Sequence, residues 1–285
     1  MLRRFITPVL ALLWLACGGV FTHAAPAPAG PTQQNQTATP GPTPDPKSAK
    51  EPTGEGVAEY VVYFYGSRAG MAQVQKSGIE RGRTTRAGDE GRSEEITYER
   101  HFMRGETSAK DKVRLNQKLP SVEYSIVYND GRLFGLINGT SFTPRQEALA
   151  PFLAERQHGI GALLRYKEDG STVTYVGKEK QKNIEMYVID LVDKEKRKTR
   201  YYVSAQRFRV LWLEYEETPP GAAQPVKYKR AFHDYRYAQG QLVPFRTVLY
   251  ADGRQVEETN VINVSFGIKL DDSIFKEAQT ASAEQ

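Results

Sequence analysis

Alternating apolar and polar residues on either side of short, Gly-containing turns dominate this sequence. The clearest case is SVEYSIVYNDGRLFGLING, from Ser121 to Gly139, in which two alternating runs flank Asp130-Gly131. An Asp-Gly pair between two such runs is a strong signal for a β-hairpin, because the tight turn needs a positive φ that Gly adopts without strain. A chain built from such units is expected to form a mainly antiparallel sheet.

The same kind of turn recurs further along the chain. In YADGRQVEET, from Tyr250 to Thr259, Asp252-Gly253 separates two runs of strand-forming residues. The adjacent carboxylates Glu257-Glu258 would point to opposite faces of a strand, so they cannot act together on one bond. We therefore interpret this stretch as a hairpin and not as a catalytic or metal-binding loop. Related turns are expected at Gln239-Gly240 and, as a weaker signal, at Glu90-Gly91.

Together these patterns predict a mainly β (α+β) domain over residues 57–276, with about ten strands joined by short turns. Two segments depart from the alternation. VAEYVVYFYGSRAGMAQVQKSG, from Val57, is predicted as helical, although its YVVYFY core is rich in β-forming residues. TPRQEALAPFLAERQHGIGALLRY, from Thr143, is the clearer helix and lies midway between the predicted strands.

The start of this second helix carries a recognisable pattern of capping residues. Thr143 can cap the helix, Pro144 suits its first position, and Gln146 completes a T-x-x-Q capping box. Leu149, Phe152 and Leu153 would then lie on one side. The segment from Leu149 to Leu164 is expected to cover one mouth of a curved sheet.

Several predicted strands are apolar on both faces. Along NIEMYVIDLV, Met186 and Val188 share one face, while Ile189 and Leu191 share the other. Along VLWLEY, Val210 and Trp212 should face away from Leu211, Leu213 and Tyr215. A sheet with one wet face would alternate cleanly, so both faces need cover. Two alternatives remain open, a filled core and a cavity for an apolar ligand, and the pattern alone favours the filled core.

Residues that could carry out chemistry are scattered. His101, His158 and His233 lie far apart, in none of the spacings that metal sites use. The chain has no G-x-S-x-G elbow, and GSTVTYVGKE does not match the glycine spacing of a phosphate loop. Its 39 basic and 34 acidic residues are interspersed, unlike the clustered charge of a nucleic-acid-binding protein. The sequence therefore predicts a protein that is not an enzyme and has no metal, cofactor or nucleic-acid partner.

The N-terminal segments have compositions of their own. Residues 1–24 resemble a secretory signal, with Arg3 and Arg4 before an uncharged run, and an uncleaved anchor is the alternative. Cys17, in LWLACGG, is a candidate for lipidation; otherwise it is a small apolar residue of the signal. Residues 25–56 are rich in Pro and Ala and are predicted to be a disordered tether, and residues 277–285 a disordered tail. The predicted location is periplasmic, with outer-membrane association as an option.

The C-terminal half contains a series of motifs in a recognisable order. YKRAFHDYRYAQGQLVPFRTVLYADGR includes Asp234-Tyr235-Arg236, Gly240 and Val243-Pro244, and NVSFGIKLDDSIF follows with Leu270-Asp271-Asp272 and Phe275. Over residues 175–275 this order resembles the periplasmic outer-membrane lipoprotein-sorting (LolA-like) group. The resemblance implies an open antiparallel half-barrel with helices covering its mouth and an apolar cavity for acyl chains.

Combining the resemblance with the two-faced strands gives a candidate site. The expected ligand is an acyl chain of a lipid or lipoprotein, held under the segment from Leu149 to Leu164, and envelope proteins are further candidate partners. The alternative is an envelope protein-interaction or stress-sensing module with the same fold and a filled core. The predicted cavity residues are Ile126, Leu136, Phe152, Met186, Val188, Trp212 and Phe245.

Overall fold

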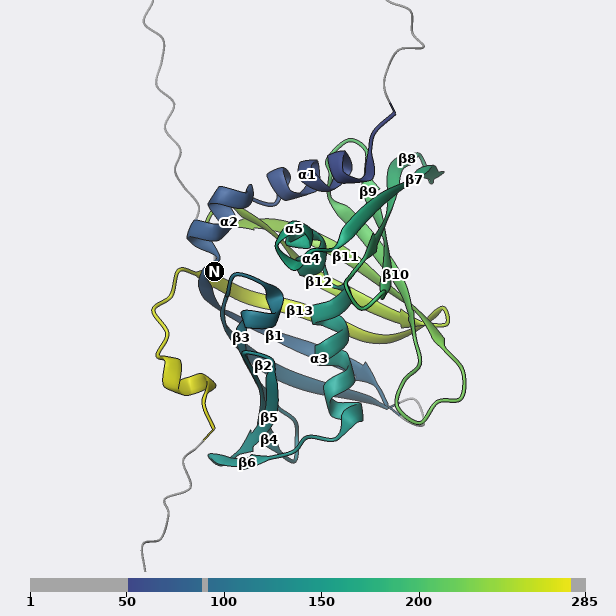
Figure 1. Cartoon of the computed structure of the whole chain (residues 1–285). Helices are drawn as coiled ribbons and strands as arrows, with labels where there is room; N and C mark the ends of the chain where they lie inside the picture. The colour runs from purple at the N-terminus through teal and green to yellow at the C-terminus, as the bar shows by residue number, and fades with distance from the viewer. Residues whose placement is uncertain (1–50, 89–91, 278–285) are drawn as a thin grey trace, which may run out of the picture. The chain divides into compact units, whose positions relative to one another are not determined.

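Thirteen antiparallel strands form one open sheet in the computed structural model, which describes residues 51–88 and 92–277 (Figure 1). The first and last strands of the chain, β1 and β13, pair at the centre, and strands from the middle of the chain, β6 and β7, form the two edges. The strands are β1 (Ser77–Ala87), β2 (Ser93–Met103), β3 (Lys112–Lys118), β4 (Glu123–Asn129), β5 (Arg132–Ile137), β6 (Thr140–Phe142), β7 (Thr172–Gln181), β8 (Ile184–Val192), β9 (Lys198–Ser204), β10 (Val210–Glu217), β11 (Val226–Ala238), β12 (Gln241–Ala251) and β13 (Arg254–Phe266).

The prediction of a mainly β, open antiparallel sheet with a few helices is confirmed, but the expected number of about ten strands was too low. The short edge strand β6 was missed because it has three residues, too few for an alternation to show. It follows a turn in which Asn138 and Gly139 have φ values of 50° and 81°. This turn folds β6 back onto β5 as a further hairpin.

The predicted Gly-containing turns have the geometry that their residues require. Asp130 and Gly131 have φ values of 48° and 83°, and Asp252 and Gly253 have 46° and 81°. Two successive positive φ values define the tight turn that matches the twist of a hairpin. YADGRQVEET is therefore the tip that joins β12 to β13, as predicted. Glu90-Gly91 lies outside the described residues.

Two helices precede the sheet, α1 (Gly54–Phe64) and α2 (Arg68–Val74). The Thr53 side chain caps α1 by accepting a hydrogen bond from the Gly56 amide. At Gly54 a Cβ atom would come within 2.6 Å of the Thr174 carbonyl carbon, so the helix begins directly against β7. The helix thus starts inside the segment predicted as a tether, whose residues 25–50 lie outside the described part of the chain, as do the predicted signal, Cys17 and residues 278–285.

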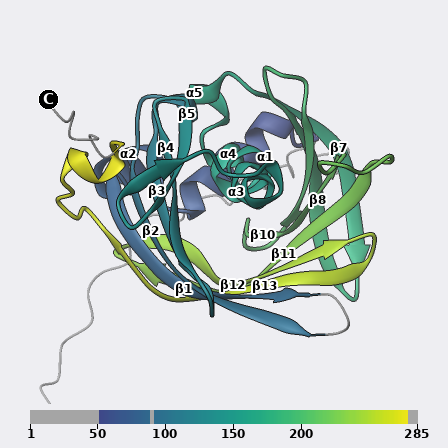
Figure 2. The ribbon, with the colours of Figure 1, turned by 90° about the horizontal axis from the view of Figure 1, so that it is seen from below.

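Three helices connect the two edges of the sheet: α3 (Gln146–His158), α4 (Ile160–Leu164) and α5 (Tyr166–Asp169). Because β6 and β7 are opposite edges, this connection must cross the sheet. Figure 2 shows α3 and α4 with strands to the left of them, below them and to the right. We call residues 146–164 the lid.

The predicted capping box of α3 is wrong. The helix begins two residues later than expected, Arg145 is its N-cap, and no side chain caps it. The pairing of β6 with β5 continues as far as Phe142, so Thr143 directly follows a strand and lies in the extended link to the helix. The predicted apolar side is correct, because Phe152 is buried with Leu149 and Leu153 packed beside it.

The largest apolar core lies between the helices and one face of the strands on the β7 side of the sheet. Val57, Val61 and Val62 of α1 and Leu163 of α4 are almost fully buried in it. These α1 residues recur at helical spacing, so the helix presents one continuous apolar side to the sheet. The strand residues of this core include Ile189, Leu191, Tyr201, Val203, Val210, Leu213 and Tyr215.

Candidate functional site

A cavity of about 350 Å³ lies between the lid and the inner face of the central strands. Its volume is at the small end of the range for ligand pockets, about 300–1,000 Å³. The inner-face strands come from both ends of the chain, because β1, β2 and β3 lie beside β11, β12 and β13 in the sheet. Its apolar lining includes Phe102, Val113, Leu115, Phe152, Ile160, Leu164, Phe232, Leu242, Leu249, Val261, Val264 and Phe266.

Two glycines of β1 make room for aromatic side chains on this inner face. Gly78 pairs with Phe102 and Gly82 with Tyr98 across the β1–β2 ladder. A Cβ atom at Gly78 would lie 2.5 Å from the Phe102 ring, and one at Gly82 would lie 2.6 Å from the Tyr98 hydroxyl. Since real side chains do not tolerate such distances, Gly at these positions lets both rings lie across β1 and form the cavity wall.

The lid closes the cavity from the other side. Phe152 of α3 and Ile160 and Leu164 of α4 face the cavity. On the same stretch, the Arg156 guanidinium lies 3.9 Å from the centre of the Tyr128 ring, which ties α3 to β4. The cavity is therefore bounded by apolar groups from both the sheet and the lid.

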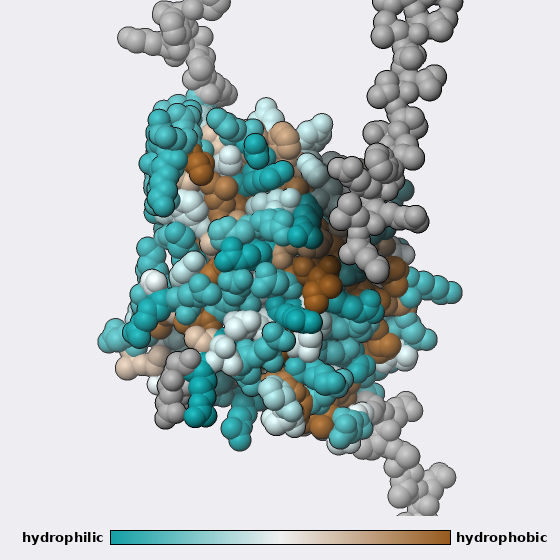
Figure 3. All heavy atoms as spheres, turned by 180° about the vertical axis from the view of Figure 1, so that it is seen from behind, coloured by the Kyte–Doolittle hydropathy of each residue, from teal (hydrophilic) through white to brown (hydrophobic). Residues whose placement is uncertain are grey.

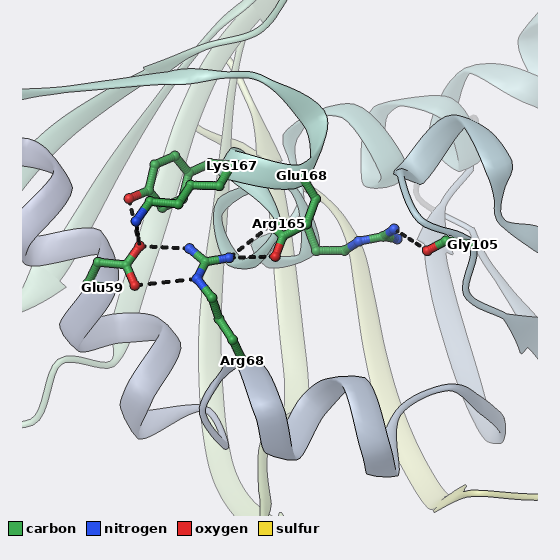
Figure 4. Close-up of polar contacts among 7 residues, drawn as sticks. Glu59, Arg68, Gly105, Arg165, Lys167 and Glu168 are labelled. Carbon is green, nitrogen blue, oxygen red and sulfur yellow. Dashed lines mark hydrogen bonds and ion pairs between the residues drawn. The ribbon is translucent and has the colours of Figure 1, made fainter.

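A network of ion pairs holds the helical elements together (Figure 4). The Arg68 guanidinium of α2 binds Glu59 of α1 at 2.7 Å and both oxygens of Glu168 of α5 at 2.7 and 2.8 Å. Arg165 donates to both carboxylate oxygens of Asp111 at 2.8 and 2.9 Å and to the Gly105 carbonyl at 2.9 Å. Arg165 and Glu168 directly follow the lid. These contacts therefore fix the segment after the lid to both the N-terminal helices and the loop after β2.

The stability of this network should depend on pH through Glu59. The hydrogen bond from Arg68 is the main reason that the pKa of Glu59 is lowered from 4.5 to about 2, although partial burial opposes it. A lowered folded-state pKa stabilises the fold above pH 4.5, and this contribution is lost as the pH falls toward 2. Glu59→Gln should therefore lower the thermal midpoint at pH 7, and the difference from wild type should shrink by pH 3.

Thermal unfolding followed by circular dichroism at both pH values would check this prediction. Glu216→Gln removes an exposed carboxylate of β10 and is the matched control. A difference between wild type and Glu59→Gln that stays constant from pH 7 to pH 3 would contradict the assigned role.

Of the seven residues predicted to bind the ligand, Phe152 alone lines this cavity. Ile126 is buried beside it in the same apolar cluster without reaching the lining. Leu136 packs elsewhere, with Phe275 at the C-terminal end of the described chain. Phe245 contacts the guanidinium of Arg236, whose carbon lies 4.5 Å from the ring centre. The role of these residues in binding stays a prediction, and their placement makes them poor candidates for this cavity.

Met186, Val188 and Trp212 belong to a cluster on the other face of the sheet, where Trp212 stacks on Tyr202 at 4.5 Å. The predicted two-faced character of β8 is confirmed, because Ile189 and Leu191 lie in the main core. Met186, Val188 and Trp212 do not line this cavity, and their role in binding stays a prediction. In β10, a bulge between Val210 and Trp212 also places Val210 with Leu213, contrary to a regular alternation.

Sequence patterns also missed the charged groups that line the cavity. Six arginines and four carboxylates lie among its apolar residues. A weak signal was present in β2, where Arg100 lies between Tyr98 and Phe102 in an alternating pattern, but a charged residue in such a pattern is normally assigned to the solvent side. The charged residues are Arg86, Arg100, Arg104, Arg156, Arg165, Arg230, Glu80, Asp111, Glu155 and Glu257.

The three histidines of residues 51–88 and 92–277 have separate environments. His158 is buried at the end of α3, with its Nδ1 2.6 Å from the Thr199 hydroxyl and its Nε2 3.1 Å from Glu217. It stacks on Tyr215 at 4.1 Å, so it joins the lid to β9 and β10. His101 contacts Glu99, and burial lowers the pKa of both His101 and His233. The three histidines therefore lie on different elements, His101 on β2, His158 on α3 and His233 on β11.

The surface offers a contrast to this interior. The face turned away from the viewer in Figure 1 is mostly hydrophilic, with separate apolar patches (Figure 3). In residues 51–88 and 92–277, no helix combines the length and the apolar character needed to span a bilayer.

The arrangement is similar to that of solved bacterial structures. A LolA superfamily protein from Nitrosomonas europaea has a TM-score of 0.56 and 14% identity, covering 79% of this chain and 97% of that one. A DUF1329 family protein from Desulfovibrio piger has a TM-score of 0.55 and 11% identity, covering 78% and 97%. No family model and no curated protein matches the sequence. At these identities the likeness concerns the fold, and at that level it confirms the LolA-like resemblance predicted from the C-terminal motifs.

Proposed function

We propose that this protein is a non-enzymatic binding protein that holds an acyl chain of a lipid or lipoprotein in the cavity between the lid and the central strands. The observation that carries the proposal is the apolar lining, which comes from the five strands β2, β3, β11, β12 and β13 and from α3 and α4. The strands surround the lid on the side of this lining, in the manner of a half-barrel (Figure 2).

The size of the cavity limits what it can hold. A volume of about 350 Å³ suits a single chain better than a lipid with several chains. Each methylene that leaves water contributes about 0.8 kcal/mol to binding, so a chain that places about ten methylenes here would gain about 8 kcal/mol, which corresponds to micromolar affinity. The cost of ordering the chain reduces this gain, which is why a preformed cavity is important.

The N-terminal sequence supports an envelope location for this activity. A signal over residues 1–24 would deliver the protein to the periplasm. If Cys17 is lipidated instead of being removed with the signal, the Pro-rich segment would separate the body from this attachment. A carrier tethered in this way would collect or release its ligand close to a membrane surface. An interaction with envelope proteins is the second function considered, and it would not require an open cavity.

Native mass spectrometry of protein purified from bacterial membranes would test the proposal, together with titration of a fluorescent fatty acid. The expected result is a co-purifying species with the mass of a lipid, and saturable binding of one probe per chain. Absence of both a bound lipid and probe binding would contradict it and would favour the protein-interaction alternative.

A further inference from the structure

Two arginines of the cavity have a buried nitrogen without a hydrogen-bond partner. They are Arg100 of β2 and Arg230 of β11, and in each the Nε atom is enclosed and unpaired among the described residues. A buried donor left unpaired destabilises a fold, and more so when its group is charged. Both side chains line the cavity, so an anion bound there would lie beside their guanidinium groups.

The two guanidinium groups also act on each other. Arg230 is 7% exposed, and burial is the main reason that its pKa is lowered to about 10. The negative charge of Glu257, which also lines the cavity, opposes this shift, and the positive charge of Arg100 adds a smaller lowering of the pKa of Arg230. Arg230 nevertheless stays protonated at neutral pH, so this part of the cavity holds two cations that repel each other. A bound anion would satisfy both.

Carboxylates already present satisfy these arginines only in part. Arg230 pairs through Nη1 with Glu155 of the lid, and Arg100 lies 3.8 Å from Glu80, too far for a hydrogen bond. Elsewhere in the cavity, Arg104 lines the wall without an ion pair among the described residues, and burial lowers its pKa to about 10. With six arginines and four carboxylates the lining carries an excess of positive charge.

From this geometry we propose that Arg100 and Arg230 bind the anionic headgroup, a carboxylate or phosphate, of an amphiphile whose acyl chain occupies the apolar part of the cavity. This inference rests on the proposed function and names the ligand class more narrowly. Arginine suits the role, because its planar group can donate two parallel hydrogen bonds to such an oxyanion. The pair of Arg230 with Glu155 then links the headgroup to the lid.

The test compares a charged and an uncharged form of one chain, cis-parinaric acid and its methyl ester, by fluorescence titration of the full chain. We expect the acid to bind at least about tenfold more tightly than the ester, as charge-assisted hydrogen bonds predict. Dodecyl phosphate should displace the acid, while inorganic phosphate at the same concentration should not, because it lacks the chain. If inorganic phosphate displaces the acid as well as dodecyl phosphate does, the assignment of the ligand as an amphiphile would be overturned.

Variants locate the headgroup. Arg230→Met combined with Glu155→Gln removes the cation without leaving its partner charged, and it should bring the acid-to-ester ratio close to one. Arg230→Lys should keep part of the preference. Arg207→Met, on the exposed link between β9 and β10, is the matched control and should keep all of it. Circular dichroism and thermal unfolding establish that each variant is folded.

Each outcome bears on a separate claim. Equal binding of acid and ester by the wild type would overturn the headgroup site and leave the acyl-chain function intact. A preference lost in Arg104→Met but kept in the double variant would also overturn the placement at Arg100 and Arg230. Failure of both ligands to bind would contradict the proposed function itself and the headgroup site with it.

Discussion

Val261→Trp should weaken the binding of a fluorescent fatty acid by roughly fifty-fold, because displacement of three methylenes from the cavity costs about 2.4 kcal/mol. Val261 lies on β13 at the centre of the sheet, opposite Gly82 of β1, and its side chain lines the cavity. An indole at this position would project into a space of about 350 Å³ and occupy a large part of it. The measurement is a titration of the probe into wild type and variant under the same conditions.

The neighbouring residue offers a matched control. Ile262 is 59% exposed, lies at a bulge of the same strand and does not line the cavity, so Ile262→Trp adds the same group outside it. Its affinity should remain within about twofold of wild type. Equal binding by Val261→Trp and Ile262→Trp would contradict the location of the ligand. A cooperative thermal transition in both variants would show that lost binding does not reflect unfolding.

Phe275→Ala should destabilise the fold by about 3–5 kcal/mol, the usual cost of removing a fully buried aromatic side chain. Phe275 belongs to η4 (Asp272–Phe275) and has no exposed surface. It packs against Val127, Phe134 and Leu136 on the face of β4 and β5 that the lid does not cover. The short C-terminal helix therefore acts as the cover for that face.

Urea unfolding of wild type and variant would measure this cost. Ile137→Ala, at a residue of β5 that is 37% exposed, is the control and should cost less than about 1 kcal/mol. A loss below about 1 kcal/mol for Phe275→Ala would mean that the C-terminal segment is not anchored in this way. The result would also assign a role to the LDDSIF motif, in which the Asp271 carboxylate accepts a hydrogen bond from the Ser273 amide.

Much of the fold could be predicted from local chemistry. Asp130-Gly131 and Asp252-Gly253 specify their hairpins because few other pairs adopt two positive φ values easily. The apolar side of α3 follows from the helical spacing of Leu149, Phe152 and Leu153. Such features depend on residues close in sequence, so a single chain contains enough information to find them.

The candidate site could not be predicted in this way, because it depends on how elements far apart in the sequence pack together. Alternation shows that β8 has two apolar faces, but the lid determines which of them faces inward, and its path from β6 to β7 is a property of the whole sheet. A bulge beside Trp212 changed the face of one further strand. Arg100 and Arg230 come from opposite halves of the chain and line the same cavity in the folded protein, so their shared environment could not be predicted from spacing.

The central claim is that an acyl chain lies between the lid and the central strands, and photo-cross-linking with a diazirine-bearing fatty acid tests it most directly. After irradiation, peptide mass spectrometry would map the labelled residues. We expect the label on cavity residues such as Leu115, Phe152 and Val261. Label concentrated on Met186 and Trp212, on the opposite face of the sheet, would contradict the claim, as would the absence of any specific label.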